Sequence, residues 1–395
     1  MMADVYKRLF SPFKLGSQTI KNRIAMAPLT RQMAHADGTP TDEMAAYYGR
    51  RARGGLGLII TEGTYEDNRL GCRAYLSQPG IVTAKHVKAW KKVADAVHAH
   101  DCKIIMQLMH GGRVSDPRVL GGKAPVSASA TQSPGWTLYT DTDYEKKIRN
   151  IDGKWPKVTF GQARALTVKE IHTVADGFAE GAARAVEAGF DGVEIHGANG
   201  YLLWQFINPK TNLRTDEFGG SPENNVRFAR LVGEKVRKAI GKTKIITLRI
   251  SQDGVDDFVG AWPGGVKYAA AVGKALKGSA YDALHWASFD YTDNRDPSSD
   301  TPMPTVIRKA SRLPMIANGG IADGAGAEAA LKSAAADMVA IGRPIFAHPD
   351  WAYIVRTGQP YPWCGFDRKY VIRPPLDYGH AYPLGLADPK WATDW

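Results

Sequence analysis

Short apolar runs alternate with amphipathic stretches along this chain from Ile24 onward. In the stretch after residue 84, Val87, Trp90, Val93 and Val97 recur at the spacing of one helix face. The apolar runs are typical of strands covered on both faces, and they lie at residues 24–27, 56–61, 103–108, 191–195, 244–250, 283–287, 315–317 and 337–341. This alternation predicts an α/β protein, a closed (βα)8 TIM barrel, over an open doubly wound sheet.

Two segments interrupt the alternation. Residues 111–165 are too long for a plain strand-to-helix connection, and we expect a lid or hairpin over the barrel mouth. A surface excursion is the alternative. Residues 360–395 are rich in Pro, Tyr and Trp and suggest an arm that packs on the barrel or on another subunit. With these additions, residues 1–395 are expected to form a single barrel domain.

The composition narrows the class of partner. The chain has 395 residues, 44% of them hydrophobic, and a net charge of +11. Its Lys and Arg residues are scattered, which argues against nucleic acid and favours a solvated basic surface that attracts anionic cofactors. The N-terminus lacks a signal-peptide core and no apolar stretch could span a bilayer, so neither export nor a membrane is expected.

The three cysteines, Cys72, Cys102 and Cys364, are few and far apart in the sequence. We therefore expect no metal site and no disulfide framework. Reduced thiols of this kind favour a cytoplasmic location.

The segment after the fourth predicted strand carries the strongest chemical signal. His196, Asn199 and Tyr201 follow the apolar run at 191–195. Singly, they fit a structural histidine, a turn and a core aromatic. Together they offer two groups that can hold a carbonyl oxygen and a hydroxyl that can deliver a proton. The combination favours an active site at the end of a barrel strand.

Four motifs carry a family resemblance: IAMAPLTR, MQLMHGGR, HGANGYLLWQF and NLRTDEFGGSPENN, in that order. From about Leu9 to about Pro349 the chain resembles the Old Yellow Enzyme family of FMN-dependent ene-reductases. The resemblance implies non-covalent FMN, reduced by NADPH or NADH, in an NADPH dehydrogenase type of enzyme. An enone or enal would then accept hydride from flavin N5, with its oxygen held by His196 and Asn199 and its α-carbon protonated by Tyr201.

The same resemblance assigns flavin contacts near the first strands. Pro28, Leu29 and Thr30 would lie beside the ring, with Thr30 near its C4 carbonyl, although a threonine can also cap a helix. Gly63 would permit close backbone approach, as a glycine in any turn does. Gln107 is a polar residue in an apolar strand and needs a partner, which the resemblance makes the flavin pyrimidine edge.

Later strands complete the implied cofactor site. The resemblance places Arg249 near flavin N1 and the C2 carbonyl, where a buried salt bridge is the alternative. Backbone N–H groups at Gly319, Gly320 and Gly342, with the guanidinium of Arg343, would bind the phosphate after the last two strands.

Other positions bear on the pocket and the scaffold. Met109 stands where the family often has an aromatic residue, which predicts a roomier pocket. A pocket tyrosine of some relatives could correspond to Tyr361, Tyr370, Tyr378 or none. Arg214 and Asp216 predict a structural ion pair, and Ser221-Pro222 predicts a helix start.

Other reactions fit the same barrel. Nitro or nitrate-ester reduction and amine demethylation remain open, because the cofactor supplies the chemistry and the pocket selects the substrate. A flavin-binding barrel without turnover is a further alternative. The sequence leaves open the substrate, the choice between NADH and NADPH, and whether the protein is a monomer or a homodimer.

Overall fold

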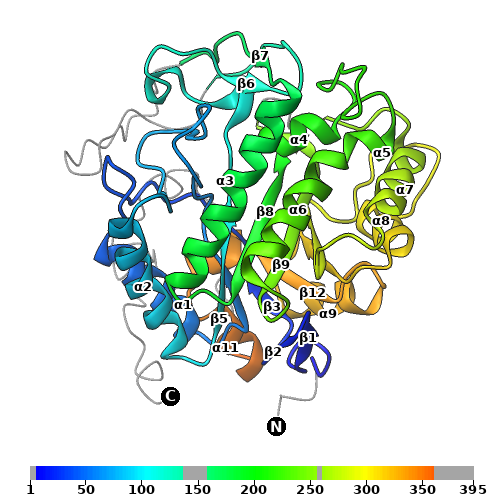
Figure 1. The fold of residues 1–395 in the computed structure, drawn as a ribbon. Helices are drawn as coiled ribbons and strands as arrows, with labels where there is room; N and C mark the ends of the chain where they lie inside the picture. The colour runs from blue at the N-terminus through cyan, green and yellow to red at the C-terminus, as the bar shows by residue number, and fades with distance from the viewer. Residues whose placement is uncertain (1–5, 137–157, 256–259, 360–395) are drawn as a thin grey trace.

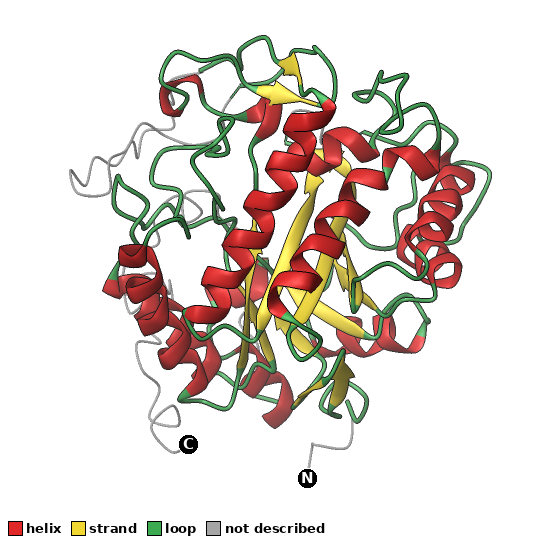
Figure 2. Cartoon of the chain, viewed as in Figure 1, coloured by secondary structure: helices red, strands yellow, loops and turns green. Residues whose placement is uncertain are grey.

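The computed structural model describes residues 6–136, 158–255 and 260–359. Within these ranges, eight parallel strands close into a barrel in the order β10-β11-β12-β3-β4-β5-β8-β9, surrounded by helices (Figure 2). They are β3 (Ile24–Met26), β4 (Leu58–Ile60), β5 (Lys103–Leu108), β8 (Gly192–Asn199), β9 (Ile245–Gly254), β10 (Ala283–Ala287), β11 (Met315–Asn318) and β12 (Met338–Ile341). The predicted (βα)8 barrel is confirmed, and each predicted strand run contains or overlaps one of these strands.

Three of the strands extend beyond their apolar runs, β11 by a single residue to Asn318. The fourth barrel strand, β8, continues to Asn199, so His196 lies within the strand and not, as predicted, at its end. Strand β9 likewise continues to Gly254. The two strands pair from Gly192 with Ile245 up to Asn199 with Gly254. Polar residues continue this ladder at the barrel mouth, so the apolar pattern alone underestimates its length.

The helices begin at recognisable caps. Thr83 and Thr167 each accept a backbone N–H in the first turn, and Glu170 completes a capping box with Thr167. The helical segments are α1 (Asp42–Arg53), α2 (Ala84–His98), α3 (Val168–Glu187), α4 (Leu202–Ile207), α5 (Pro222–Asn225), α6 (Arg227–Ile240), α7 (Gly265–Leu276), α8 (Met303–Ser311), α9 (Gly324–Lys332), α10 (Arg343–Ala347), α11 (Trp351–Thr357) and the 3-10 turns η1 (Gly112–Val114) and η2 (Pro117–Val119).

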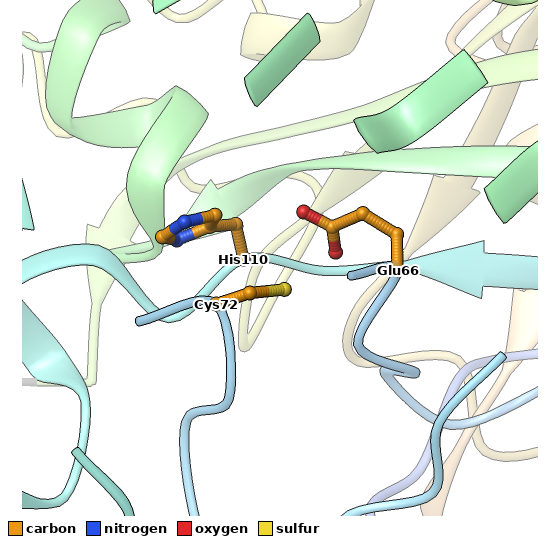
Figure 3. Close-up of side chains that lie close together, drawn as sticks. All are labelled: Glu66, Cys72 and His110. Atoms are coloured by element: carbon orange, nitrogen blue, oxygen red, sulfur yellow. The ribbon is translucent and has the colours of Figure 1, made fainter. Parts of the chain in front are cut away.

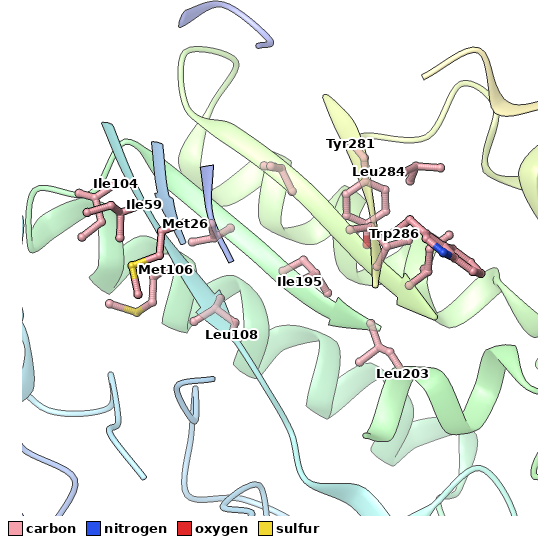
Figure 4. Packing of buried hydrophobic residues seen from close by; sticks show 14 of the residues in the cluster. Met26, Ile59, Ile104, Met106, Leu108, Ile195, Leu203, Tyr281, Leu284 and Trp286 are labelled. Carbon is pink, nitrogen blue, oxygen red and sulfur yellow. The ribbon is translucent and has the colours of Figure 1, made fainter. Parts of the chain in front are cut away.

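The core has two layers. Outward-facing strand residues such as Met106, Ile195 and Trp286 pack beneath the helices (Figure 4). Inward-facing Ala25, Leu58 and other small or aliphatic residues fill the lower barrel. A hairpin of β1 (Phe13–Leu15) and β2 (Gln18–Ile20) places Leu15 and Ile20 against that inner layer. The barrel is therefore plugged at the end opposite its mouth.

The insertion lies at the other end of the barrel from this hairpin (Figure 1). Its strands β6 (Val126–Ser127) and β7 (Arg164–Ala165) pair in parallel. Antiparallel bridges join Gln132 to Gln162 and Trp136 to Thr159. The residues that join these two bridged segments, 137–157, lie outside the described ranges, so the lid or hairpin stays a prediction. The predicted arm at 360–395, with Tyr361, Tyr370, Tyr378 and Cys364, lies outside the described residues.

Several smaller predictions can be compared with the structure. Arg214 Nε lies 2.9 Å from Asp216 Oδ1, which confirms the structural ion pair. Ser221 caps α5 with Pro222 in its first turn, as predicted. In the described ranges, Cys72 and Cys102 are buried free thiols, and no helix is long and apolar enough to cross a membrane.

Candidate active site

The carboxyl ends of the barrel strands bring the predicted site residues to one mouth. Pro28, Leu29 and Thr30 follow β3, and Gly63 follows β4. Gln107 lies in β5, His196 and Asn199 in β8, and Arg249 in β9. Gly319 and Gly320 follow β11, and Gly342 and Arg343 follow β12. This is the end at which such barrels assemble active sites.

His196 and Tyr201 form the centre of the mouth. His196 is 2% exposed and Tyr201 is 4% exposed, and their ring centroids lie 5.0 Å apart. Burial, reinforced by the charges of Arg249 and His285, holds the pKa of His196 well below its ordinary value. Its ring is therefore neutral, and its Nδ1 accepts the N–H of Ala198 at 3.4 Å. Its Nε2 then carries the hydrogen and can donate it to a substrate oxygen.

Asn199 sits on an irregular backbone. The pairing of β8 with β9 shifts between Gly197 and Asn199, and Asn199 has a φ of 57°. Asparagine tolerates this left-handed conformation better than most residues. The Oγ of Ser251 accepts its backbone N–H at 2.8 Å, and its carbonyl accepts the N–H of Val255 at 3.0 Å. The backbone is fixed while the amide side chain makes no hydrogen bond to the described residues.

Arg249 is a buried cation beside His196 in the strand ladder. Only 6% of it is exposed, and burial lowers the pKa of its guanidinium. Its Nη2 donates to Asn318 Oδ1 at 3.1 Å, whereas its Nε is buried without an acceptor among the described residues. In that part of the chain no carboxylate lies within 4.0 Å of it. The buried salt bridge considered from the sequence is therefore not formed there.

The carboxylate of Glu194, which was not predicted as a site residue, connects the side chains beneath the mouth. Glu194 accepts the Nε2–H of Gln107 at 2.9 Å, the Thr247 hydroxyl at 3.0 Å and His285 Nδ1–H at 2.8 Å. Burial opposes its ionisation, but His285, Arg249 and Gln107 together lower the pKa of Glu194. A charged residue inside an apolar strand was the signal that could have revealed this network.

One consequence concerns Gln107, which is 2% exposed. Its amide nitrogen is committed to Glu194, so the amide oxygen is the end that remains for another group. The sequence resemblance made the flavin the partner of Gln107. The structure gives its nitrogen a protein partner and fixes the orientation of the amide.

Gly63 and Met109 pack against each other at the mouth. A Cβ added to Gly63 would lie 2.5 Å from Met109 Sδ, so any larger residue there would displace the end of the methionine side chain. Met109 also clusters with Tyr75, Phe160 and Tyr201. Phe160 comes from the insertion and Tyr75 from the loop after β4, and neither was identified from the sequence. The Tyr75 hydroxyl lies 3.4 Å from Thr30 Oγ1.

The residues predicted for phosphate binding lie after β11 and β12. Gly319 and Gly320 have φ values of 130° and 71°, which side chains other than glycine rarely adopt. Arg343 is exposed and donates from Nη2 to the carbonyl of Phe289 at 3.3 Å. A Cβ on Gly342 would lie 3.7 Å from Leu29 Cδ2, so the ends of the first and last barrel strands adjoin.

This arrangement can bind a carbonyl compound beside an electron-rich cofactor. Neutral His196 and Asn199 can donate to oxygen, Tyr201 can donate a proton, and Arg249 can stabilise negative charge. The fold and the site thus define an α/β-barrel whose mouth holds hydrogen-bond donors to oxygen, a proton donor and a buried cation.

Comparison with known proteins agrees with this description. The model of the NADH:flavin oxidoreductase / NADH oxidase family matches residues 8–361. The chain is 34% identical over 381 residues to chanoclavine-I aldehyde reductase of Penicillium roqueforti, covering 94% of this chain and 95% of that protein. It is 32% identical over 373 residues to NADH oxidase of Thermoanaerobacter brockii, which covers 90% of this chain. The chain spans only 51% of that longer relative.

A solved structure extends the agreement to three dimensions. Morphinone reductase in complex with tetrahydroNAD superposes with a TM-score of 0.77 at 32% identity, covering 92% of this chain and 94% of that one. The chain belongs to the NADH:flavin oxidoreductase / NADH oxidase family, the Old Yellow Enzyme family of FMN-dependent oxidoreductases. The family resemblance predicted from the four sequence motifs is confirmed.

Proposed function

We propose that this protein binds FMN at the barrel mouth and reduces the activated C=C bond of α,β-unsaturated carbonyl compounds with NADPH or NADH. The observation that carries the proposal is one cluster at the mouth. Neutral, buried His196 neighbours the buried guanidinium of Arg249 on the next strand, and the Tyr201 phenol lies beside the same imidazole. Hydrogen-bond donors, a cation and an acid are thus combined in one place.

The residues present fit FMN. Buried Arg249 Nε has no acceptor in the described part of the chain, and the oxygen of Gln107 is the free end of a fixed amide. These two side chains would hold the polar edge of the ring, with Pro28, Leu29, Thr30 and Gly63 beside it. Gly319, Gly320, Gly342 and Arg343 would hold the phosphate. When bound, FMN supplies a carrier that takes hydride from a nicotinamide and passes it to an electrophilic carbon.

The chain's own residues would act on the substrate. His196 and Asn199 would donate hydrogen bonds to the carbonyl oxygen, which makes the β-carbon more electrophilic. Tyr201 would give its hydroxyl proton to the α-carbon and regain one from solvent. Met109, Tyr75 and Phe160 line the same cluster and would shape the space above these donors. A phenol that is nearly buried but adjoins donors to oxygen is well placed for this role.

The choice of nicotinamide belongs to the proposal as well. Morphinone reductase, a protein of the same fold, has been solved with tetrahydroNAD. This supports a nicotinamide as the reductant here, and the 2′-phosphate that distinguishes NADPH from NADH is left to experiment.

The test is an anaerobic spectroscopic titration of the purified protein with both nicotinamides. Each should bleach the bound flavin, and the preferred one should do so faster. The reduced protein is then mixed with enones, nitro compounds or secondary amines in separate experiments. We expect rapid reoxidation by enones. Faster turnover of nitro compounds or amines than of every enone would assign one of the alternative reactions, and FMN absorbance without bleaching by either nicotinamide would indicate a non-catalytic flavin protein.

A further inference from the structure

A second cluster of chemically active side chains lies away from the donors described above. Glu66, Cys72 and His110 are all buried, and their candidate ligand atoms lie within 4.8 Å of one another. Figure 3 shows the three side chains gathered where the loop after β4 meets the chain leaving β5. Glu66 and Cys72 come from the former and His110 from the latter. None of the three enters the proposed hydride and proton transfers.

These side chains are short of partners. Both carboxylate oxygens of Glu66 and the Nε2 of His110 are buried without a hydrogen-bond partner in the described residues. The Cys72 thiol lies 3.9 Å from the Met109 carbonyl and also faces the Glu66 carboxylate. Buried polar atoms are ordinarily satisfied, so a group of orphans facing one another calls for a missing ligand. An apolar ligand would leave every one of them unsatisfied.

We propose that Glu66, Cys72 and His110 bind a zinc ion that ties the loop after β4 to the chain following β5. A thiolate, an imidazole and a carboxylate are the ligand types that zinc prefers. Three protein ligands leave the fourth tetrahedral position to water.

Charge balance favours a divalent ion. A neutral imidazole at His110 offers a lone pair without adding charge. Binding would displace one proton from the Cys72 thiol and one from the Glu66 carboxylic acid to solvent. A thiolate and a carboxylate then neutralise the two charges of the ion. No carboxylate–cation pair to Glu66 within 4.0 Å competes in the described chain.

Zinc binding requires two adjustments, a closer approach of the three side chains and the rotation of one peptide. Ligand atoms around tetrahedral zinc lie roughly 3.4 to 3.6 Å apart. The three ligand atoms here lie within 4.8 Å of one another, so the longest separation must shorten by about 1 Å. Nδ1 of His110 accepts the N–H of Gly112 at 3.1 Å. Coordination through Nε2 places the ring hydrogen of His110 on Nδ1. The backbone N–H of Gly112, which now donates to Nδ1, must then be replaced there by a hydrogen-bond acceptor. The peptide between Gly111 and Gly112 can turn its carbonyl to that nitrogen because both flanking residues are glycine, and this rotation would break the 3.4 Å hydrogen bond that the carbonyl accepts from Gln205 Nε2.

The proposed ion would act as a tether for the mouth. The His110 carbonyl accepts the N–H of Leu202 at 3.0 Å, next to Tyr201. The Gly111 N–H donates to the Cys72 carbonyl at 2.8 Å. A metal at this point would add side-chain bonds to these backbone contacts and fix the loops that carry Met109 and Tyr201. Its role would be structural.

The experiment measures metal directly in the flavin-loaded protein. Protein produced with zinc in the medium and purified without chelators should contain close to one zinc per chain by elemental analysis. Replacement by cobalt should give a thiolate-to-cobalt charge-transfer band in the difference spectrum against the zinc form. Cys72→Ser should lower zinc affinity more than about 100-fold and abolish that band. Cys102→Ser, which changes the other described buried thiol, should retain both.

Each other result decides against the site. Wild-type protein that carries no zinc and takes up none when zinc is added would overturn the proposal. Equal zinc content in Cys72→Ser and Cys102→Ser would do the same. Should Cys72→Ser fail to fold, Glu66→Gln provides the zinc measurement, and a wild-type cobalt spectrum without the thiolate band rules out Cys72 as a ligand.

Discussion

The two ends of the barrel treat buried charge in opposite ways. At the base, an aspartate stands just before every second strand of the later barrel: Asp191 before β8, Asp282 before β10 and Asp337 before β12. Each accepts a backbone N–H from a neighbouring strand, donated by Ile104, Ile246 and Met315 respectively. Each also meets a basic side chain, namely Lys103, Arg237 or Arg308. These three carboxylates are therefore paired within the protein itself.

At the mouth, several buried polar groups lack such partners. Arg249 Nε, the guanidinium nitrogens of Arg31, the carboxylate of Glu66 and His110 Nε2 have no hydrogen-bond partner in the described chain. Arg31 instead lies 4.2 Å from the ring centroid of Phe346 and 5.1 Å from that of Tyr47. Leaving such groups unpaired is costly. The contrast indicates that the base serves stability and that the mouth is built to be completed by ligands.

The largest expected effect lies at the mouth. Tyr201→Phe keeps the ring and its packing but removes the proposed acid. Reoxidation of the reduced protein by an enone should slow by about 10²–10⁴-fold, because the α-carbon must be protonated. A quinone, which needs no proton on carbon, should be much less affected. Stopped-flow traces with impaired flavin reduction and unchanged enone reoxidation would instead make Tyr201 a nicotinamide-positioning or structural residue.

The proposed phosphate site comes next. Arg343→Ala should weaken FMN binding by roughly one to two decades, since a charge-assisted contact is worth about 1.5–3 kcal/mol. Arg237→Ala, at the base, is the matched control and should retain FMN while lowering stability. Flavin release on dilution, followed by fluorescence, measures both. Equal retention of FMN by Arg343→Ala and wild type would count against the phosphate placement.

A substitution at the base should show the reverse pattern. Burial alone would raise the pKa of Asp191, but hydrogen bonds from His98, Ile104 and Lys103 outweigh it and lower that pKa. Asp191→Ala removes these bonds and should lower the free energy of unfolding by about 1–3 kcal/mol. The loss should fall toward the lower end of this range, because solvent screens the partly exposed His98 and Lys103. Urea unfolding measures the loss. FMN affinity should match wild type, and a selective loss of FMN affinity would contradict the division between the two ends.

The smallest effect concerns pH. Because burial keeps the pKa of His196 well below 6.5, its ring stays neutral through the ordinary titration range of histidine. Binding of a neutral cyclic ketone should therefore change less than about twofold between roughly pH 5 and pH 8. Loss of affinity as the pH falls through the ordinary histidine value would show instead that His196 titrates normally.

The sequence predicted the strands better than the fine structure of the mouth. Apolar runs located the eight strands, because parallel strands covered on both faces exclude polar residues. The same criterion ended the predicted fourth strand at Ile195, because His196 is polar. In the structure β8 continues through His196 to Asn199. The packing of Met109 on Gly63 joins two loops whose approach no local pattern records.

Glu194 and Phe160 show two further limits. Glu194 carried a readable signal, a charge within an apolar strand, but its three donors come from three other strands. Phe160 reaches Tyr201 through the fold of a long insertion. The roles of the site residues themselves remain predictions.

The most direct test of the contrast between base and mouth is Arg249→Met, measured for both FMN affinity and unfolding free energy of the apoprotein. Methionine replaces a buried cation that has no carboxylate within 4.0 Å in the described chain, and apolar replacements of buried charged groups are often neutral or stabilising. We predict that FMN affinity falls at least about tenfold while the apoprotein stays within about 1 kcal/mol of wild type or becomes more stable. A marked loss of apoprotein stability with unchanged FMN affinity would contradict the account.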